Sequence, residues 1–310
     1  MTSTAMSTGS VAARLGTALA KIWRGGRKVE RRAYVVGAVL FASGLVAAAV
    51  LLVTGGSWTG PVSLRKAATF GMSFGLTLAT VAWAVSYLKI TERSRTFLLT
   101  VFTVVSVVET GLVSMQAWRG VPSHFNFETP FDSVVSMSLA AGGGVIILSI
   151  LGLASATIAG TRDLSAAMRI AVRAGFVILL IALAVGAVMI ARGVVEARSG
   201  QAQLAYTTAG ELKPAHAVAM HAILVLPGLA WLVDLTGWAD RVKTRVVLVG
   251  TGGYALLTAV VLVESIRGVS PFAASAPEMA VSVLAVALVV GAALGAAAGL
   301  VPPGQRGSDS

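Results

Sequence analysis

The sequence predicts an all-α membrane protein, a polytopic bundle of about eight transmembrane helices with both termini in the cytoplasm. Three observations predict this class. Hydrophobic residues make up 56% of the 310 residues and charged residues only 12%, whereas a soluble domain carries about a quarter charged residues. Apolar runs long enough to cross a hydrocarbon core of about 30 Å recur along the chain. Lys and Arg gather in alternate connecting segments.

The first element is a basic cytoplasmic tail, residues 1–32. Within it Val11, Leu15, Leu19 and Ile22 recur at helical spacing, with basic residues elsewhere on the helical wheel. This pattern is typical of an amphipathic helix lying on the inner leaflet. A disordered basic tail is the alternative. No cleavable signal peptide is expected, because the first apolar run follows a long polar tail and is too long for a signal h-region.

The transmembrane bundle is predicted to occupy residues 33–301, followed by a cytoplasmic tail, 302–310. Its spans are expected at about 33–55, 67–88, 97–118, 133–160, 170–191, 214–236, 246–266 and 279–301. Counted from a cytoplasmic N-terminus, the inner segments hold more Lys and Arg than the outer ones, which fixes the predicted orientation. We therefore expect a multi-pass protein of the plasma membrane whose partner is the lipid bilayer.

Composition also excludes several classes of chemistry. The chain has no cysteine, so it cannot form disulfides, Cys-ligated zinc sites, iron–sulfur clusters or thiol nucleophiles. Its net charge of +11 could suggest nucleic acid, but the basic residues lie in short loops beside apolar runs. That distribution is typical of topology signals, so no nucleic-acid partner is expected.

A weak internal repeat accompanies the predicted spans. The tripeptide Arg-Gly-Val begins at Arg119, Arg192 and Arg267, each time at the outer end of an odd-numbered span. An acidic residue lies near each copy, namely Glu109, Glu196 and Glu264. Repetition of a helical hairpin and convergence on a common way to end a helix both explain the pattern.

Glu109 is the polar outlier inside a predicted span. It lies ten residues before Arg119, or about 15 Å along a helix from the outer end. An ionisable group at this depth is costly and is a candidate for function. A protonated, hydrogen-bonded structural glutamate is the alternative.

The loop after this span carries further candidates, between Gln116 and Asp132. It holds charged and polar groups among aromatic rings, and two prolines and a glycine restrict its backbone. We predict that Glu109, Arg119 and Asp132 take part in the chemistry of a site to which His124 also belongs. An ordinary interfacial loop with solvated charges is the alternative.

The chain has only three histidines, and all are predicted to lie near the outer face. A donor set that suits a transition metal consists of the carboxylate of Glu109 and the imidazoles of His124, His216 and His221. However, His216 and His221 are five residues apart, about 140° on an ideal helix. A haem b held by His124 and His221 avoids that difficulty. Structural histidines are the alternative.

Two blocks carry a resemblance to known proteins. Arg119–Asn126 reads RGVPSHFN, and Ala215–His221 reads AHAVAMH with Leu-Pro following. In these blocks the chain resembles an uncharacterised group of multi-pass bacterial membrane proteins, which implies no reaction. The chain is only loosely similar to seven-span membrane hydrolases that bind zinc through histidines. Those proteins pair their histidines as HxxxH, so their activity is not transferred to this chain.

Three functions remain open from the sequence. The one that the sequence favours is a metal- or haem-dependent membrane protein, redox or hydrolytic, working from the outer leaflet. The second is a proton-coupled transporter in which Glu109 carries the proton, and Arg119 and Arg267 attract an anionic substrate. The third is an accessory or assembly subunit of a membrane complex.

Overall fold

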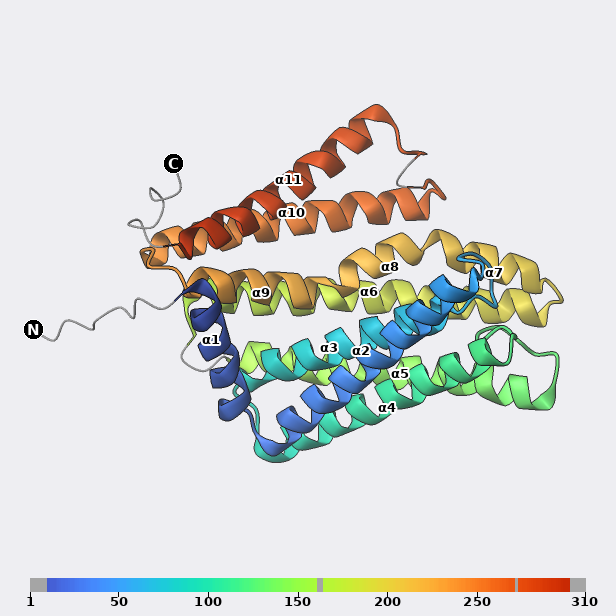
Figure 1. The fold of residues 1–310 in the computed structure, drawn as a ribbon. Coiled ribbons are helices and arrows are strands. Elements are labelled where there is room, and N and C mark those ends of the chain that lie inside the picture. Colours follow the sequence, from blue (N-terminus) through green and yellow to red (C-terminus); the bar gives the residue numbers. More distant parts are fainter. Residues whose placement is uncertain (1–9, 161–163, 271–272, 302–310) are drawn as a thin grey trace, which may run out of the picture.

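The computed structural model describes residues 10–160, 164–270 and 273–301, and its long elements are all α-helices. Eight segments of this part of the chain are long and apolar enough to cross a membrane, which confirms the predicted bundle (Figure 1). They are α2 (Lys28–Thr54), α3 (Arg65–Ser86), α4 (Glu92–Trp118), α5 (Pro130–Ala159), α6 (Ala166–Arg198), α8 with α9 (Lys213–Met220 and Ala222–Asp234), α10 (Asp240–Ile266) and α11 (Ala276–Gly299).

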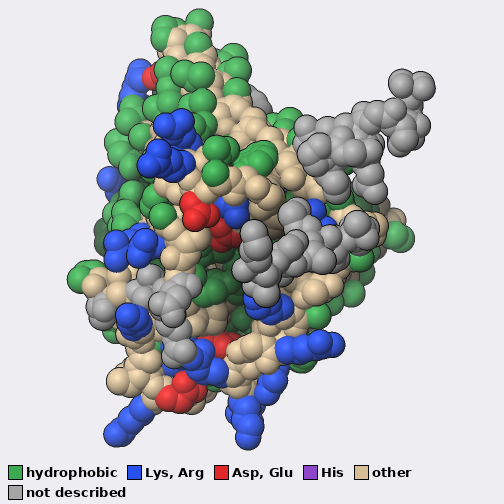
Figure 2. Space-filling model, turned by 90° about the vertical axis from the view of Figure 1, so that its left-hand side faces the viewer, with side chains coloured by type: hydrophobic (Ala, Val, Ile, Leu, Met, Phe, Trp, Pro, Cys, Tyr) green, Lys and Arg blue, Asp and Glu red, His purple; other side chains and the backbone are tan. Residues whose placement is uncertain are grey.

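The spans run alternately in opposite directions, so both described termini reach the same end of the bundle (Figure 1). This end also carries α1 (Val11–Gly25), and we call it the inner end, following the charge bias of the sequence. The opposite end carries α7 (Ala202–Glu211), and we call it the outer end. Lys and Arg side chains are spread over the inner end (Figure 2).

Helix α1 lies across the inner end of the bundle instead of running along the spans (Figure 1). Its Arg14 donates hydrogen bonds to the main-chain oxygens of Leu300, at 2.9 Å, and of Leu235. Leu19 and Trp23 are 57% and 47% exposed. A helix therefore forms over these residues, as expected for the amphipathic alternative, and its exposed apolar side chains suit a lipid–water boundary.

Helices α2 and α3 are in backbone contact because glycines line both of them. A Cβ atom on Gly71 would lie 2.6 Å from the main-chain nitrogen of Gly44, and one on Gly75 would lie 2.5 Å from the oxygen of Gly37. Real Cβ atoms do not approach backbone so closely. Small residues of this kind let membrane helices pack tightly where lipid supplies no hydrophobic driving force.

A buried ion pair joins three helices near the inner end. Glu30 and Arg95 are both fully buried, with Arg95 Nη1 3.2 Å from Glu30 Oε1. Glu30 also accepts hydrogen bonds from the main-chain and guanidinium nitrogens of Arg27, at 2.8 and 3.0 Å. Arg95 donates to the oxygens of Val85 and Leu88 at the end of α3. Glu30 lies in the first turn of α2, which begins at Lys28, five residues before the predicted 33.

The connection after α6 differs from the expected loop. The span runs to Arg198, beyond the predicted residue 191, and a separate helix α7 follows in the segment expected to be a plain connection. The next span is interrupted at His221, between α8 and α9. Pro227 lies inside α9, and a proline removes a main-chain donor and disturbs the turn before it.

The predicted orientation can be tested with single cysteines, because the natural chain has none. Ser199 follows α6 at the outer end and Arg93 opens α4 at the inner end, and both are exposed. We expect a membrane-impermeant maleimide to label Ser199→Cys in intact cells, and Arg93→Cys only after permeabilisation. Labelling of Arg93→Cys alone in intact cells would reverse the orientation.

Candidate functional site

The loop between α4 and α5 is held at its base by Asp132. One carboxylate oxygen accepts hydrogen bonds from Gln116 Nε2 at 2.8 Å and Arg119 Nη1 at 2.7 Å, and the other from the Thr129 hydroxyl at 2.7 Å. Arg119 also donates to Gln116 Oε1, and its guanidinium lies 4.8 Å from the Phe131 ring centre. The structure thus brings the predicted residues Arg119 and Asp132 together, as partners of each other.

The same loop contains a residue in an unfavourable backbone conformation. Phe125 has φ of +60°, a region that an aromatic residue rarely adopts. Its ring is buried against α6, at a position where a Cβ on Gly193 would collide with it. The next residue, Asn126, exchanges main-chain hydrogen bonds of 3.1 and 2.9 Å with the Ser136 hydroxyl of α5. Packing and hydrogen bonding therefore hold the strained conformation in place.

His124 precedes this strained residue and lies among α3 side chains. Its Nδ1 is 2.9 Å from the Ser123 hydroxyl, and its ring centre is 5.7 Å from that of Phe70. Burial lowers the pKa of His124 to about 3, and the positive charges of Lys66 and Lys213 act in the same direction. His124 is therefore neutral near pH 7 and offers a hydrogen-bonding nitrogen instead of a charge.

Glu109 is buried at the α4–α5 interface, with 4% of its surface exposed. A Cβ on Gly142 of α5 would collide with Glu109 Oε1, so this glycine makes the space that the carboxyl group occupies. No hydrogen-bond partner meets that oxygen within the described residues. Toward the outer end, Val113 packs with Val135 and Leu139. An apolar cluster thus covers the interface between Glu109 and the outer loop.

The two histidines of the sixth span point to different partners. His216 Nδ1 is 2.8 Å from the main-chain oxygen of Ala182 on α6, and its ring lies against Gly186. His221 Nδ1 is 2.6 Å from the oxygen of Ala217 in its own span. The interruption at His221 therefore does not align the two imidazoles on one partner.

The four predicted metal ligands do not gather into one site in the part of the chain that the structure describes. No three His, Asp or Glu side chains there are placed to hold a common metal ion. The Glu109 side chain packs against α5, and His216 is hydrogen-bonded to α6. Neither a hydrogen bond nor a ring contact joins His124 to His221. The geometry thus gives no support to a metal centre built from Glu109, His124, His216 and His221.

A second carboxylate, on Glu264, is buried inside the bundle. Glu264 of α10 is 1% exposed, and neither of its carboxylate oxygens has a hydrogen-bond partner among the described residues. The neighbouring Arg267 pairs with Glu278 of α11 instead. Glu196 of α6 also has one buried oxygen without a partner. All three acids near the Arg-Gly-Val copies therefore have a buried oxygen without a hydrogen-bond partner in the described part of the chain.

Two lysines at the outer end were also missed as site residues. Lys66 lies in the first turn of α3 and Lys213 opens α8. In the sequence both are only basic residues of the outer segments, which run against the charge bias. Their side chains matter because Arg119 and Arg267, the arginines expected to attract an anion, are each paired with a carboxylate.

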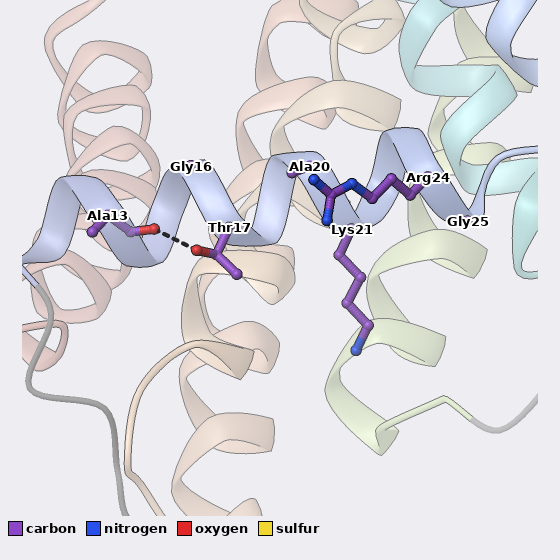
Figure 3. A pocket seen from close by; sticks show the side chains of 7 residues that line it. All are labelled: Ala13, Gly16, Thr17, Ala20, Lys21, Arg24 and Gly25. Atoms are coloured by element: carbon purple, nitrogen blue, oxygen red, sulfur yellow. Dashed lines mark hydrogen bonds between the residues drawn. The ribbon is translucent and has the colours of Figure 1, made fainter.

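A hollow of about 790 Å³ lies along α1, away from all these residues. Small side chains line it together with Lys21 and Arg24 (Figure 3). These residues lie on the side of the helix opposite to its apolar face. None of the predicted site residues takes part, so the hollow does not bear on the outer site.

The fold defines the class of this protein as a multi-pass α-helical membrane protein. Comparison with known protein families, with curated proteins and with solved structures finds no match. The resemblance carried by the RGVPSHFN and AHAVAMH blocks therefore stays a prediction.

Proposed function

We propose that this protein is a permease of the plasma membrane in which Glu109 carries a proton. The observation that carries this proposal is the buried Glu109 carboxyl group, whose Oε1 has no hydrogen-bond partner in the described residues. A structural glutamate would be expected to satisfy its oxygens, since an unsatisfied buried polar group is costly. A carboxyl group that exchanges a proton during a transport cycle instead needs a site where both protonation states can be reached.

A proton and a monovalent anion moving together carry no net charge across the membrane. Such a pair is driven by concentration gradients and avoids the cost of moving an unbalanced charge against the membrane potential. The second buried carboxyl group, on Glu264, provides a further protonatable position in α10. The recurrence of such acids on α4, α6 and α10 suits a transporter built from related hairpins.

The other two hypotheses are weaker on the present geometry. A metal-dependent function lacks a gathered ligand set in the described residues, and no contact among those residues favours an accessory subunit. Elemental analysis and a visible spectrum of the purified protein separate these cases. A stoichiometric metal, or a haem spectrum lost in His124→Ala, would replace the transport proposal.

Glu109→Gln tests the proposed proton carrier. The amide is nearly isosteric with a protonated carboxyl group but cannot release a proton. In proteoliposomes with an internal pH-sensitive dye, we expect inward gradients of permanently charged small anions, such as benzenesulfonate, to acidify the lumen with the natural protein. Glu109→Gln should abolish this acidification.

Glu128→Gln is the matched control, because Glu128 is an exposed glutamate of the outer loop. It should acidify the lumen like the natural protein. Equal acidification by Glu109→Gln and Glu128→Gln, at equal amounts of folded protein, would remove Glu109 from the mechanism.

A further inference from the structure

Positive charge gathers at the outer end where α3 and α8 begin. The charge of Lys213 acts on Lys66, and the charge of Arg65 acts on both lysines. Each lysine lies in the first turn of its helix, where the helix dipole is also positive. The two lysines therefore repel each other, and the positive ends of the two helix dipoles repel them as well. A bound anion would reduce this repulsion.

Neither lysine is neutralised by the described part of the chain. No ion pair or hydrogen bond occupies the ammonium group of Lys66 or Lys213 there, whereas Arg65 donates to the Trp58 oxygen. Glu128 is close enough to Tyr206 for an electrostatic interaction, but it is exposed and forms an ion pair with neither lysine. Lys66 is partly buried and Lys213 is exposed, so an anion from solution can reach them.

Aromatic rings lie beside the two lysines. The Lys66 ammonium is 5.7 Å from the Tyr206 ring centre, and that ring is 6.2 Å from the ring of Phe125. His124 lies between Phe125 and Phe70, at 6.0 and 5.7 Å between ring centres. The strained conformation of Phe125 and its packing on α6 keep these rings in place. Flat apolar surface thus adjoins uncompensated positive charge.

We propose that Lys66, Lys213 and His124 bind the charged group of a small monoanion whose flat apolar part contacts Phe70 and Tyr206. A carboxylate or a sulfonate would accept charge-assisted hydrogen bonds from the ammonium groups. The rings would exclude water from one side of the ligand and supply contact area.

The assignment of this anion as the transported substrate rests on the proposed function, whereas the binding site itself does not. Equilibrium binding in detergent needs no proton movement. Glu109→Gln should therefore bind the anion like the natural protein even though it does not transport. If the natural protein binds the anion but does not transport it, the permease is ruled out and the anion site remains.

The test is calorimetric titration of the purified full-length protein with benzenesulfonate and with methanesulfonate, which lacks the ring. We expect saturable binding of benzenesulfonate and at least tenfold weaker binding of methanesulfonate. Lys66→Gln and Lys213→Gln should each weaken benzenesulfonate binding by about tenfold, the loss of one charge-assisted contact. Lys89→Gln is the matched control, because Lys89 is an exposed lysine at the inner end.

Lys66→Arg keeps the charge and should retain binding, which separates loss of charge from loss of fold. Absence of saturable benzenesulfonate binding by the natural protein would overturn the site. So would unchanged affinity in both glutamine variants, or equal affinities for the two sulfonates.

Discussion

Arg95→Met is expected to lower the free energy of unfolding by about 3–5 kcal/mol, because it leaves the buried Glu30 carboxylate without its guanidinium partner. Methionine fills a similar volume but cannot donate to Glu30 or to the oxygens of Val85 and Leu88. The three helix ends that meet at Arg95 would then hold unsatisfied polar groups. The measurement is thermal or denaturant unfolding of the purified protein in detergent.

Arg93→Met is the matched control, since Arg93 is exposed two residues away on the same helix. It should change stability by no more than a surface substitution, about 0.5 kcal/mol. The double variant Glu30→Gln, Arg95→Met should recover part of the loss, because it no longer buries an unpaired charge. An Arg95→Met protein as stable as Arg93→Met would contradict the importance of the pair.

Gly71→Ala is the second change with a large expected effect. The added Cβ would meet the backbone of Gly44, at 2.6 Å from its nitrogen and 2.7 Å from its Cα, and backbone cannot move aside as a side chain can. We expect destabilisation by about 1–3 kcal/mol, typical of overpacking. Unfolding in detergent measures it.

Gly111→Ala provides the comparison, because a Cβ on Gly111 of α4 would meet nothing within 4 Å. Alanine is favoured over glycine in a helix interior by up to about 1 kcal/mol. Gly111→Ala should thus be neutral or stabilising, opposite in sign to Gly71→Ala. The same sign for both variants would show that the α2–α3 contact is looser than the structure indicates.

The structure also changes how the outer loop is understood. Arg119 and Asp132 were predicted as reactive groups, but they bind one another and Gln116 at the base of the loop. Their role in the structure is to position the segment that carries His124 and Phe125. Lys66 and Lys213 have no ion pair in the described residues, and in the sequence they are only two of the basic residues of the outer segments.

The sequence by itself determined the class of fold and the number of spans. Long apolar runs between charged loops admit few structures in a bilayer, where each helix must satisfy its own backbone. Hydropathy therefore placed all eight spans to within several residues, and it singled out Glu109 as an acid in the middle of α4. The span positions and the depth of Glu109 depend on residues that are neighbours along the chain, so the sequence alone is sufficient to predict them.

Only the tertiary structure decided which side chains meet. Three contacts join different helices or loops: Glu109 lies against Gly142, the Phe125 ring packs on Gly193, and Lys66 lies near the Tyr206 ring. Such contacts depend on helix rotation and crossing, which glycines at backbone contacts set and hydropathy does not encode. For the same reason three histidines on one side of the predicted bundle did not make one site, since each imidazole faces the partner that its own helix or loop presents.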